Sequence, residues 1–201
     1  MKPALRIERL AGADILARLD DLARLRMAVF RDWPYLYEGS LGYERNYLRT
    51  YARSKSAVLV AAFDADAVVG ASTALPLAEA MEECIAPFRA RGCDLATVFY
   101  FGESVLLKPY RGLGAGVRFF AEREAAARAH PGVRIAAFCG VERPADHPLR
   151  PRDYVPLDAF WSKRGYTRHP ELVAKFHWRD IGAAADTWKP LVFWLKRLDA
   201  E

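Results

Sequence analysis

The chain has 201 residues, of which 52% are hydrophobic and 27% are charged, and its formal net charge is +5 at pH 7. This length and composition exclude a disordered chain and indicate one well-cored domain, which we expect to span residues 1–201. Because basic and acidic residues are interspersed along the chain, the net charge allows an anionic ligand but does not indicate a nucleic-acid partner.

Neither a secretion signal nor a membrane span is expected. The first ten residues contain no apolar core of a signal peptide, and no apolar run reaches the roughly 18 residues that a membrane helix needs. Three cysteines, Cys84, Cys93 and Cys139, lack C-x-x-C spacing, which favours reduced thiols over a disulfide framework or a zinc site. We therefore expect a cytoplasmic protein with no membrane partner and no metal.

The first part of the chain predicts a strand, two helices and a strand hairpin. The first strand alternates apolar and polar residues, and both helices carry apolar residues at helical spacing. An aromatic loop separates the two helices, and Asp64-Ala65-Asp66 is typical of a hairpin turn. These elements are expected at residues 4–10 (strand), 13–30 and 43–53 (helices), and 57–63 and 67–75 (paired strands).

The middle of the chain predicts a helix, then a β-α-β unit. Residues 78–92 are expected to be helical as far as a break at Pro87. Residues 96–107 are apolar on both faces and predict a central strand. A helix that ends at Pro131-Gly132 and a strand at 133–141 follow, so the two strands are expected to be parallel neighbours.

The last part of the chain begins with a segment, residues 142–156, that is too rich in proline and arginine for regular structure. A short helix with Gly165 at its end is expected within residues 157–166. Residues 171–178 and 188–195 are expected to pair as a last antiparallel hairpin.

Three alternating glycines stand where the helix after the central strand should begin, in the stretch Arg111-Gly112-Leu113-Gly114-Ala115-Gly116. Each glycine inside a helix costs about 1 kcal/mol relative to alanine. Free N–H groups and the positive end of the helix dipole form an anion site, which glycine lets a phosphate approach closely. The stretch therefore predicts a pyrophosphate site, with Arg111 and Lys108 adding charge. A turn that only permits tight packing is the alternative.

The better-known phosphate and hydrolase motifs do not fit this stretch. A dinucleotide-binding G-x-G-x-x-G would need glycine at Val117 or Phe119, and no Walker A sequence occurs. The nucleophile elbow G-x-S-x-G fails because Leu106 occupies its last position. Dehydrogenases, nucleotide hydrolases and serine hydrolases are all disfavoured.

The pattern R-x-x-G-x-G is met after a strand by Arg111, Gly114 and Gly116, and here the sequence resembles the GNAT superfamily of acetyl-CoA-dependent N-acetyltransferases. Residues 102–120 resemble its core motif, and residues 160–166 resemble its late helix end. The resemblance implies a mixed α+β (α/β) fold. Its sheet would be central, mostly antiparallel and of about seven strands, flanked by helices, with one β-α-β unit carrying the CoA pyrophosphate loop.

The resemblance also implies where acetyl-CoA binds as a cosubstrate. The loop amides would bind the pyrophosphate, and the end of the preceding strand would bind pantetheine through backbone groups left unpaired where two parallel strands splay apart. An amide near Val105 would face the thioester oxygen. Carried over, the loop residues are Arg111, Gly112, Leu113, Gly114, Ala115 and Gly116, and the strand residues are Val105, Leu106 and Leu107.

Acetylation needs a neutral amine, whereas an alkylammonium group has a pKa near ~10.4. A general base typically contributes ~10²–10⁴-fold. Glu103, a carboxylate in an otherwise apolar strand, is the candidate, and a structural glutamate is its alternative. For the acid that protonates the leaving thiolate, Trp161 stands where the family commonly has tyrosine and cannot donate a proton in that way. Tyr154 or water would then serve, and no acid is assigned.

The acceptor side is expected at the first two helices and the last hairpin. Aromatic and acidic residues there suit a cationic or aromatic amine, or simply pack the helices on the sheet. Arginines of residues 142–156 instead suit an acidic acceptor, and the sequence does not choose. The residues that suit a cationic or aromatic amine are Trp33, Tyr35, Tyr37, Glu38, Tyr43 and Glu44. Those that suit an acidic acceptor are Arg143, Arg150 and Arg152.

The sequence thus favours an N-acetyltransferase that moves an acetyl group to a primary amine, a small molecule or a peptide, by direct attack in a ternary complex. A non-catalytic acyl-CoA-binding module of the same fold is the alternative. A nucleic-acid binder is disfavoured, and whether the chain forms a homodimer stays open.

Overall fold

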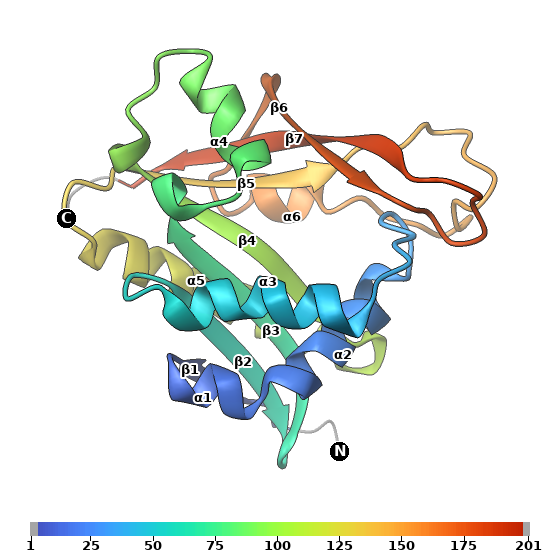
Figure 1. The fold of residues 1–201 in the computed structure, drawn as a ribbon, viewed down its shortest axis with the longest axis horizontal. Helices are drawn as coiled ribbons and strands as arrows, with labels where there is room; N and C mark the ends of the chain where they lie inside the picture. Colours follow the sequence, from blue (N-terminus) through green and yellow to red (C-terminus); the bar gives the residue numbers. More distant parts are fainter. Residues whose placement is uncertain (1–3, 199–201) are drawn as a thin grey trace.

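The computed structural model describes residues 4–198, which form one seven-stranded sheet in the order β1-β2-β3-β4-β5-β7-β6 (Figure 1). All neighbouring strands are antiparallel except β4 and β5, which are parallel. The expected mixed fold, with a mostly antiparallel sheet of seven strands, is confirmed. The strands are β1 Arg6–Leu10, β2 Val58–Asp64, β3 Ala67–Pro76, β4 Val98–Leu106, β5 Ile135–Val141, β6 Thr167–Trp178 and β7 Thr187–Arg197.

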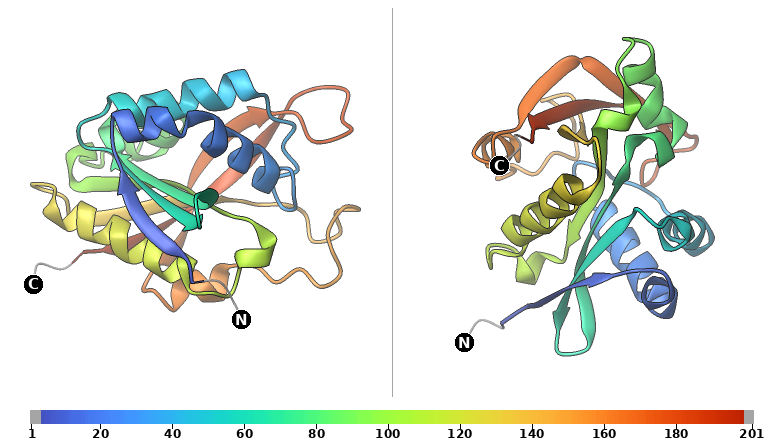
Figure 2. Two further views of the ribbon diagram at one scale, coloured as in Figure 1. Left: turned by 90° about the horizontal axis from the view of Figure 1, so that it is seen from below. Right: turned by 90° about the vertical axis from the view of Figure 1, so that its left-hand side faces the viewer.

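Helices cover both faces of the sheet (Figure 2). One face carries α1 Ala13–Ala17, α2 Leu19–Phe30, α3 Leu41–Arg53 and α4 Glu82–Arg89. The other face carries α5 Ala115–Ala129 and α6 Asp158–Ser162. No helix among residues 4–198 is long and apolar enough to cross a membrane.

Two of the expected helices differ from the sequence-based prediction. The single helix expected at 13–30 is two helices, because Arg18 leaves the helical conformation (φ −110°, ψ 13°). The apolar spacing is the same for one helix or two, so it does not reveal this break. The prediction that Pro87 ends the helix at 78–92 was wrong, since α4 starts at Glu82 and continues to Arg89. Burial of Phe88, whose ring packs 4.9 Å from that of Phe193, keeps the helix going past the proline.

A bulge interrupts the central strand. Ser72 pairs with Ser104 but Ala74 pairs with Phe101, so β4 has one more residue than β3 in this interval. Such an extra residue changes the alternation of side chains along a strand. Consequently Gly102 and Glu103, although adjacent, both face the hydroxyl groups of α3.

The two parallel strands part soon after they meet. The β4–β5 pairing covers only the three pairs from Val98–Ile135 to Tyr100–Ala137. β5 stays paired with β7 along its whole length, from Ile135 to Val141. A gap therefore opens between the carboxyl-terminal halves of β4 and β5, as expected from the resemblance.

Candidate active site

The loop before α5 owes two of its glycines to backbone conformation. Gly112 and Gly114 have φ values of +77° and +85°, in the left-handed region that glycine adopts without strain. Apart from the glycine itself and its chain neighbours, no heavy atom of residues 4–198 lies within 4 Å of where a Cβ would stand at either position. Gly114 is the N-cap of α5 and the helix has no side-chain cap.

The amides of residues 112–116 donate no backbone hydrogen bond within the described residues. Unbonded donors are thus gathered at the positive end of the α5 dipole, which is the arrangement that binds anions.

The third glycine of the loop has a different role. A Cβ on Gly116 would lie 3.3 Å from Cζ of Phe160 in α6, so this glycine allows α5 and α6 to pack closely. The packing alternative considered for the glycines therefore applies to Gly116. Of the two cations predicted beside the loop, Arg111 donates from Nε to the carbonyl oxygen of Leu106 at 3.1 Å, and Lys108 pairs with Asp32 at 3.0 Å.

The structure separates the three strand residues expected to bind pantetheine. The amide of Leu107 donates to the carbonyl oxygen of Val69 in β3 at 3.0 Å. Backbone groups alternate in direction along an antiparallel strand, so those of Val105 also point to β3. Only Leu106 directs its amide and carbonyl groups to the side where β5 has parted from β4.

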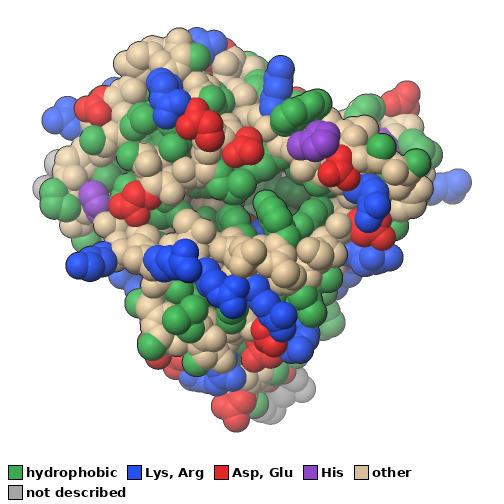
Figure 3. All heavy atoms as spheres, viewed as in Figure 1, with side chains coloured by type: hydrophobic (Ala, Val, Ile, Leu, Met, Phe, Trp, Pro, Cys, Tyr) green, Lys and Arg blue, Asp and Glu red, His purple; other side chains and the backbone are tan. Residues whose placement is uncertain are grey.

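A cavity of about 500 Å³ lies between α2, α3, α4 and the β6–β7 hairpin, with the gap between β4 and β5 at its base. Figure 3 shows the mouth of this hollow, with hydrophobic side chains inside it. Gly102 and Glu103 of β4 and Cys139 of β5 line it. The cavity therefore reaches the part of the sheet where β4 and β5 are not paired.

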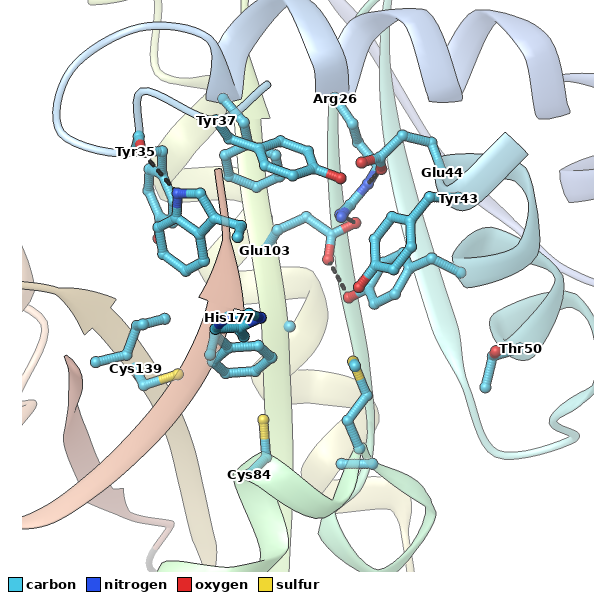
Figure 4. Close-up of a pocket in the computed structure, with 18 of the residues that line it drawn as sticks. Arg26, Tyr35, Tyr37, Tyr43, Glu44, Thr50, Cys84, Glu103, Cys139 and His177 are labelled. Atoms are coloured by element: carbon cyan, nitrogen blue, oxygen red, sulfur yellow. Dashed lines mark hydrogen bonds and ion pairs between the residues drawn. The ribbon is translucent and has the colours of Figure 1, made fainter. Parts of the chain in front are cut away.

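Glu103 lies in the wall of this cavity beside Arg26 (Figure 4), and three side chains hold it. Its Oε2 accepts from the Tyr47 hydroxyl at 2.7 Å and from the Thr73 hydroxyl at 2.8 Å, and its Oε1 forms an ion pair with Arg26. Burial and then the charge of Glu103 raise the pKa of Tyr47 well above its usual value, so this hydroxyl remains a donor. Glu103 is therefore both a cavity residue and a member of a buried polar network, which is the arrangement expected of a base and of a structural glutamate alike.

Arg26 was not among the residues expected at the site. It lies between Glu44 and Glu103, which both pair with it. Burial disfavours the charged guanidinium, yet the carboxylates outweigh burial and raise the pKa of Arg26. The signal was present in the pattern, because Arg26 shares the buried face of α2 with Leu22 and Leu25. A charged residue on the apolar face of one helix requires an opposite charge nearby.

A second buried arginine lies behind the bulge, on the α5 side of the sheet. The guanidinium of Arg123 donates to the carbonyl oxygens of Phe119, Thr73 and Glu103 at 3.2, 3.5 and 3.4 Å. Burial lowers the pKa of Arg123 to about 10. Arg123 thus binds the carbonyl groups on both sides of the bulge and links α5 to the strand that carries Glu103.

Most of the residues expected on the acceptor side do line the cavity. Tyr35, Tyr37, Glu38, Tyr43 and Glu44 line it, together with the hairpin residues Phe176, His177 and Trp178.

Trp33 is the exception, since its ring packs on those of His147 and Tyr154 outside the cavity. The arginines of residues 142–156 do not line the cavity either. Arg143 is bound to Asp180 at 2.7 Å and Arg150 stacks on Tyr154.

Trp161 and Tyr154, the residues considered for the acid role, lie elsewhere. The Trp161 ring is packed between Phe138 and Trp194 on the α5 side of the sheet, at centroid distances of 5.0 and 5.2 Å. The thiols Cys84 and Cys139 lie in the cavity wall near the hydroxyl of Tyr100, which is 3.5 Å from Sγ of Cys139. Among the described residues, no group of three or more His, Cys, Asp or Glu side chains is placed to hold a metal ion.

The parted parallel strands, the bulged central strand and the glycine loop before α5 define the GNAT fold. The solved structures to which the chain is similar have this fold. It matches a PaiA N-acetyltransferase from Thermoplasma acidophilum in complex with coenzyme A, at 13% identity and a TM-score of 0.56, over 97% of this chain and 99% of that one.

Two further solved structures match at a TM-score of 0.60. An aminoglycoside 6'-N-acetyltransferase complexed with coenzyme A matches at 16% identity over 98% of each chain. GphF, a GNAT-like decarboxylase in complex with isobutyryl-CoA, matches at 19% identity over 96% of this chain and 100% of that one. No protein-family profile and no curated protein sequence matches the chain. The chain has the GNAT fold, at sequence identities that reveal the fold alone.

Proposed function

We propose that the protein is an acetyl-CoA-dependent N-acetyltransferase, which moves the acetyl group to a primary amine by direct attack in a ternary complex. The observation that carries this proposal is the parting of β4 and β5 after Tyr100 and Ala137. The end of β4 leads into the glycine loop of α5, while the same gap is the base of a cavity lined by Glu103. A thioester in the gap would thus be within reach of both an anion site and an amine.

Coenzyme A suits the loop and the end of β4. The unbonded amides of residues 112–116 would bind its pyrophosphate, and the amide of Leu106, whose carbonyl oxygen accepts from Arg111, would bind the pantetheine arm. Structures of similar fold contain coenzyme A or isobutyryl-CoA, which supports this class of ligand. Acetyl-CoA acts here as a cosubstrate, and the reaction needs no metal.

In this proposal Glu103 accepts the proton of the amine. The ammonium group gives a proton to the carboxylate, the amine nitrogen then attacks the thioester carbonyl carbon, and the C–S bond breaks as the C–N bond forms. Tyr47, Thr73 and Arg26 fix the carboxylate, which restricts the base to one position facing the cavity. Water accepts the second proton, which the nitrogen loses as the amide forms, and also protonates the departing thiolate, because Trp161 cannot act as an acid; Glu103 then releases its proton to solvent.

The test is an assay of acetyl-CoA consumption against a panel of small amines, amino acids, polyamines and peptides. We expect at least one amine to accelerate release of the CoA thiol, and mass spectrometry to find the acetylated amine. Coenzyme A should also raise the Tm of the protein, because a ligand that binds only the folded state stabilises it. If coenzyme A leaves Tm unchanged at millimolar concentration, the proposal is wrong.

A non-catalytic acyl-CoA-binding module is the second candidate. The observation that favours it is the full engagement of Glu103 by Arg26, Tyr47 and Thr73, as in a purely structural network. This candidate predicts the same rise in Tm with coenzyme A but no turnover with any amine. The two measurements together therefore distinguish it from the enzyme.

A further inference from the structure

Two carboxylates share one guanidinium in the wall of the cavity. Glu44 and Glu103 both pair with Arg26, and the side chains of Glu44, Glu103 and Arg26 are 0%, 5% and 9% exposed. Figure 4 shows the guanidinium of Arg26 between the two carboxylates. Counted as ionised groups, the three side chains have one negative charge in excess in a buried place, which is costly unless a cation binds there.

Oε1 of Glu44 receives no hydrogen bond of good geometry from the described residues, although its atom is buried and the residue lines the cavity. The Tyr37 hydroxyl lies beside Glu44, and burial, then the charge of Glu44 and a hydrogen bond to its carboxylate, raise the pKa of Tyr37. A neutral hydroxyl cannot offset the charge. An acceptor oxygen of this kind, beside a cavity, is suited to a donor that arrives with a ligand.

The neighbouring cations do not offset the excess charge by direct contact. Arg123 lies on the opposite side of β4, and its acceptors among residues 4–198 are carbonyl oxygens. At the mouth, Arg179 pairs with Glu38 at 3.0 Å, and His177 lies 3.8 Å from Asp186. The remaining carboxylate of the lining, Glu79, accepts from the hydroxyl of Ser54.

Aromatic rings form a large part of the remaining cavity wall. A volume of about 500 Å³ is typical of a small-molecule site, not of a groove for a folded partner. Ring faces attract cations and exclude water from an apolar ligand, and the Arg26 guanidinium already stacks on the Tyr47 ring at 4.0 Å. The rings that line the cavity include Phe30, Tyr35, Tyr37, Tyr43, Phe176 and Trp178.

We propose that the acceptor of this site is a small primary amine with an aromatic body, one ammonium group and no carboxylate, and that its ammonium binds beside Glu44 and Glu103 on the cavity side of Arg26. The inference rests on the proposed N-acetyltransferase function. The ammonium supplies the missing positive charge and donates to Oε1 of Glu44, then gives one proton to Glu103 before the nitrogen attacks the thioester. The products are the N-acetyl amine, the CoA thiol and one proton.

The excess of negative charge also predicts that amino acids are disfavoured as acceptors. An amino acid would bring a second carboxylate into a wall that already has an excess of negative charge.

Calorimetry measures the binding of three small molecules, which share a phenylethyl group, to the full chain in the presence of coenzyme A. These are 2-phenylethylamine, 2-phenylethanol, which has no charge, and phenylalanine, which adds a carboxylate. We expect 2-phenylethylamine to bind at least about 10-fold more tightly than the other two, as hydrogen bonds to charged groups predict. Equal or tighter binding of 2-phenylethanol or phenylalanine would overturn the proposal.

Glu44→Gln, which keeps the shape and removes one charge, is the matched variant. It should weaken binding of 2-phenylethylamine about 10- to 100-fold, leave the affinity for coenzyme A unchanged, and leave Tm equal or higher because the remaining Arg26–Glu103 pair is neutral. Glu122→Gln removes an exposed carboxylate paired with Arg9 outside the cavity and should change none of these. Unaltered amine affinity in a folded Glu44→Gln protein would contradict the proposal.

Failure of this inference and failure of the proposed function give different results. If other amines are acetylated while 2-phenylethylamine neither binds nor reacts, the acceptor class is wrong and the transferase stands. If 2-phenylethylamine binds as expected and no amine of the panel is acetylated, the cation site stands and the transferase is wrong.

Discussion

Replacing Gly102 with alanine would place a methyl group inside the network that holds Glu103. An ideal Cβ at this position lies 2.4 Å from the Tyr51 hydroxyl oxygen, 2.5 Å from the Thr73 hydroxyl oxygen and 3.2 Å from the Tyr47 hydroxyl oxygen. Real Cβ atoms essentially never approach other atoms within 3.0 Å. At least two of the three hydroxyl groups must therefore move, and two of the three, those of Thr73 and Tyr47, donate to Glu103.

The expected cost follows from overpacking of a buried site, which destabilises proteins by about 1–3 kcal/mol. In a domain of this size, each kcal/mol corresponds to about 2–4 °C in Tm, so Tm of Gly102→Ala should fall by about 2–12 °C. If Glu103 is the base, its displacement by about 1 Å should also lower kcat about 100-fold.

Thermal unfolding followed by circular dichroism measures the first effect, and acetyl-CoA consumption at 25 °C measures the second. Gly42→Ala is the matched control, because no atom lies within 4 Å of its Cβ position in α3. Alanine is the better helix former, so the free energy of unfolding of this control should rise by up to about 1 kcal/mol. A Gly102→Ala protein as stable and as active as the wild type would refute the role of the bulge in holding Glu103.

Four other substitutions test the site and its surroundings. Glu103→Gln should lower kcat/KM by about 10²–10⁴-fold while coenzyme A still raises Tm, and an unchanged rate would remove Glu103 from the mechanism. Gly114→Ala and Gly132→Ala place alanine at positive φ (+85° and +80°) at the two ends of α5, so each should cost about 1–2 kcal/mol. Only Gly114→Ala should also weaken binding of coenzyme A in calorimetry, and equal weakening by both would indicate a general effect of strain. Asp180 is partly buried, which opposes ionisation, but Arg143 and Lys189 lower its pKa below the ordinary value. The stability that ionised Asp180 contributes is therefore present above the ordinary pKa of aspartate and is lost as pH falls toward the lower pKa of the folded protein. The free energy of unfolding, measured in urea, should therefore decrease less for Asp180→Asn than for the wild type when the pH is lowered to about 3.

The sequence predicted the fold well where one pattern has one structural meaning. Residues 96–107 are apolar on both faces, and such a strand fits only the middle of a covered sheet, where β4 lies. The glycines at 112–116 predicted a loop at the start of a helix, and α5 begins there, after Gly112 and Gly114, which both have positive φ. Gly116 followed the same spacing for another reason, the closeness of Phe160, which depends on a helix more than forty positions later in the chain.

The bulge and the polar network could not be predicted from local pattern. The extra residue in β4 exists only relative to β3, so it is a property of the pairing and not of either strand alone. In the sequence, Thr73 is an ordinary β-branched strand residue. In the structure, the bulge places Glu103 where the Thr73 hydroxyl can donate to it. Arg26 offered a local signal, an arginine on an apolar helix face, but its two partners come from α3 and β4.

The net charge of the chain is a poor guide to the charge of its cavity, because burial leaves an excess of carboxylates on one side of β4. On the α5 side, the buried carboxylate of Glu124 pairs with Lys196 and Arg128, and Arg123 donates to carbonyl groups, close to the helix whose N-terminus would bind the anionic pyrophosphate. On the α2–α3 side, Glu44 and Glu103 exceed the single charge of Arg26. A protein with a positive total can therefore offer a negative pocket. If the two substrates are an anionic coenzyme and a cationic amine, this difference directs each to its own face of one strand, and the strand itself holds the base between them.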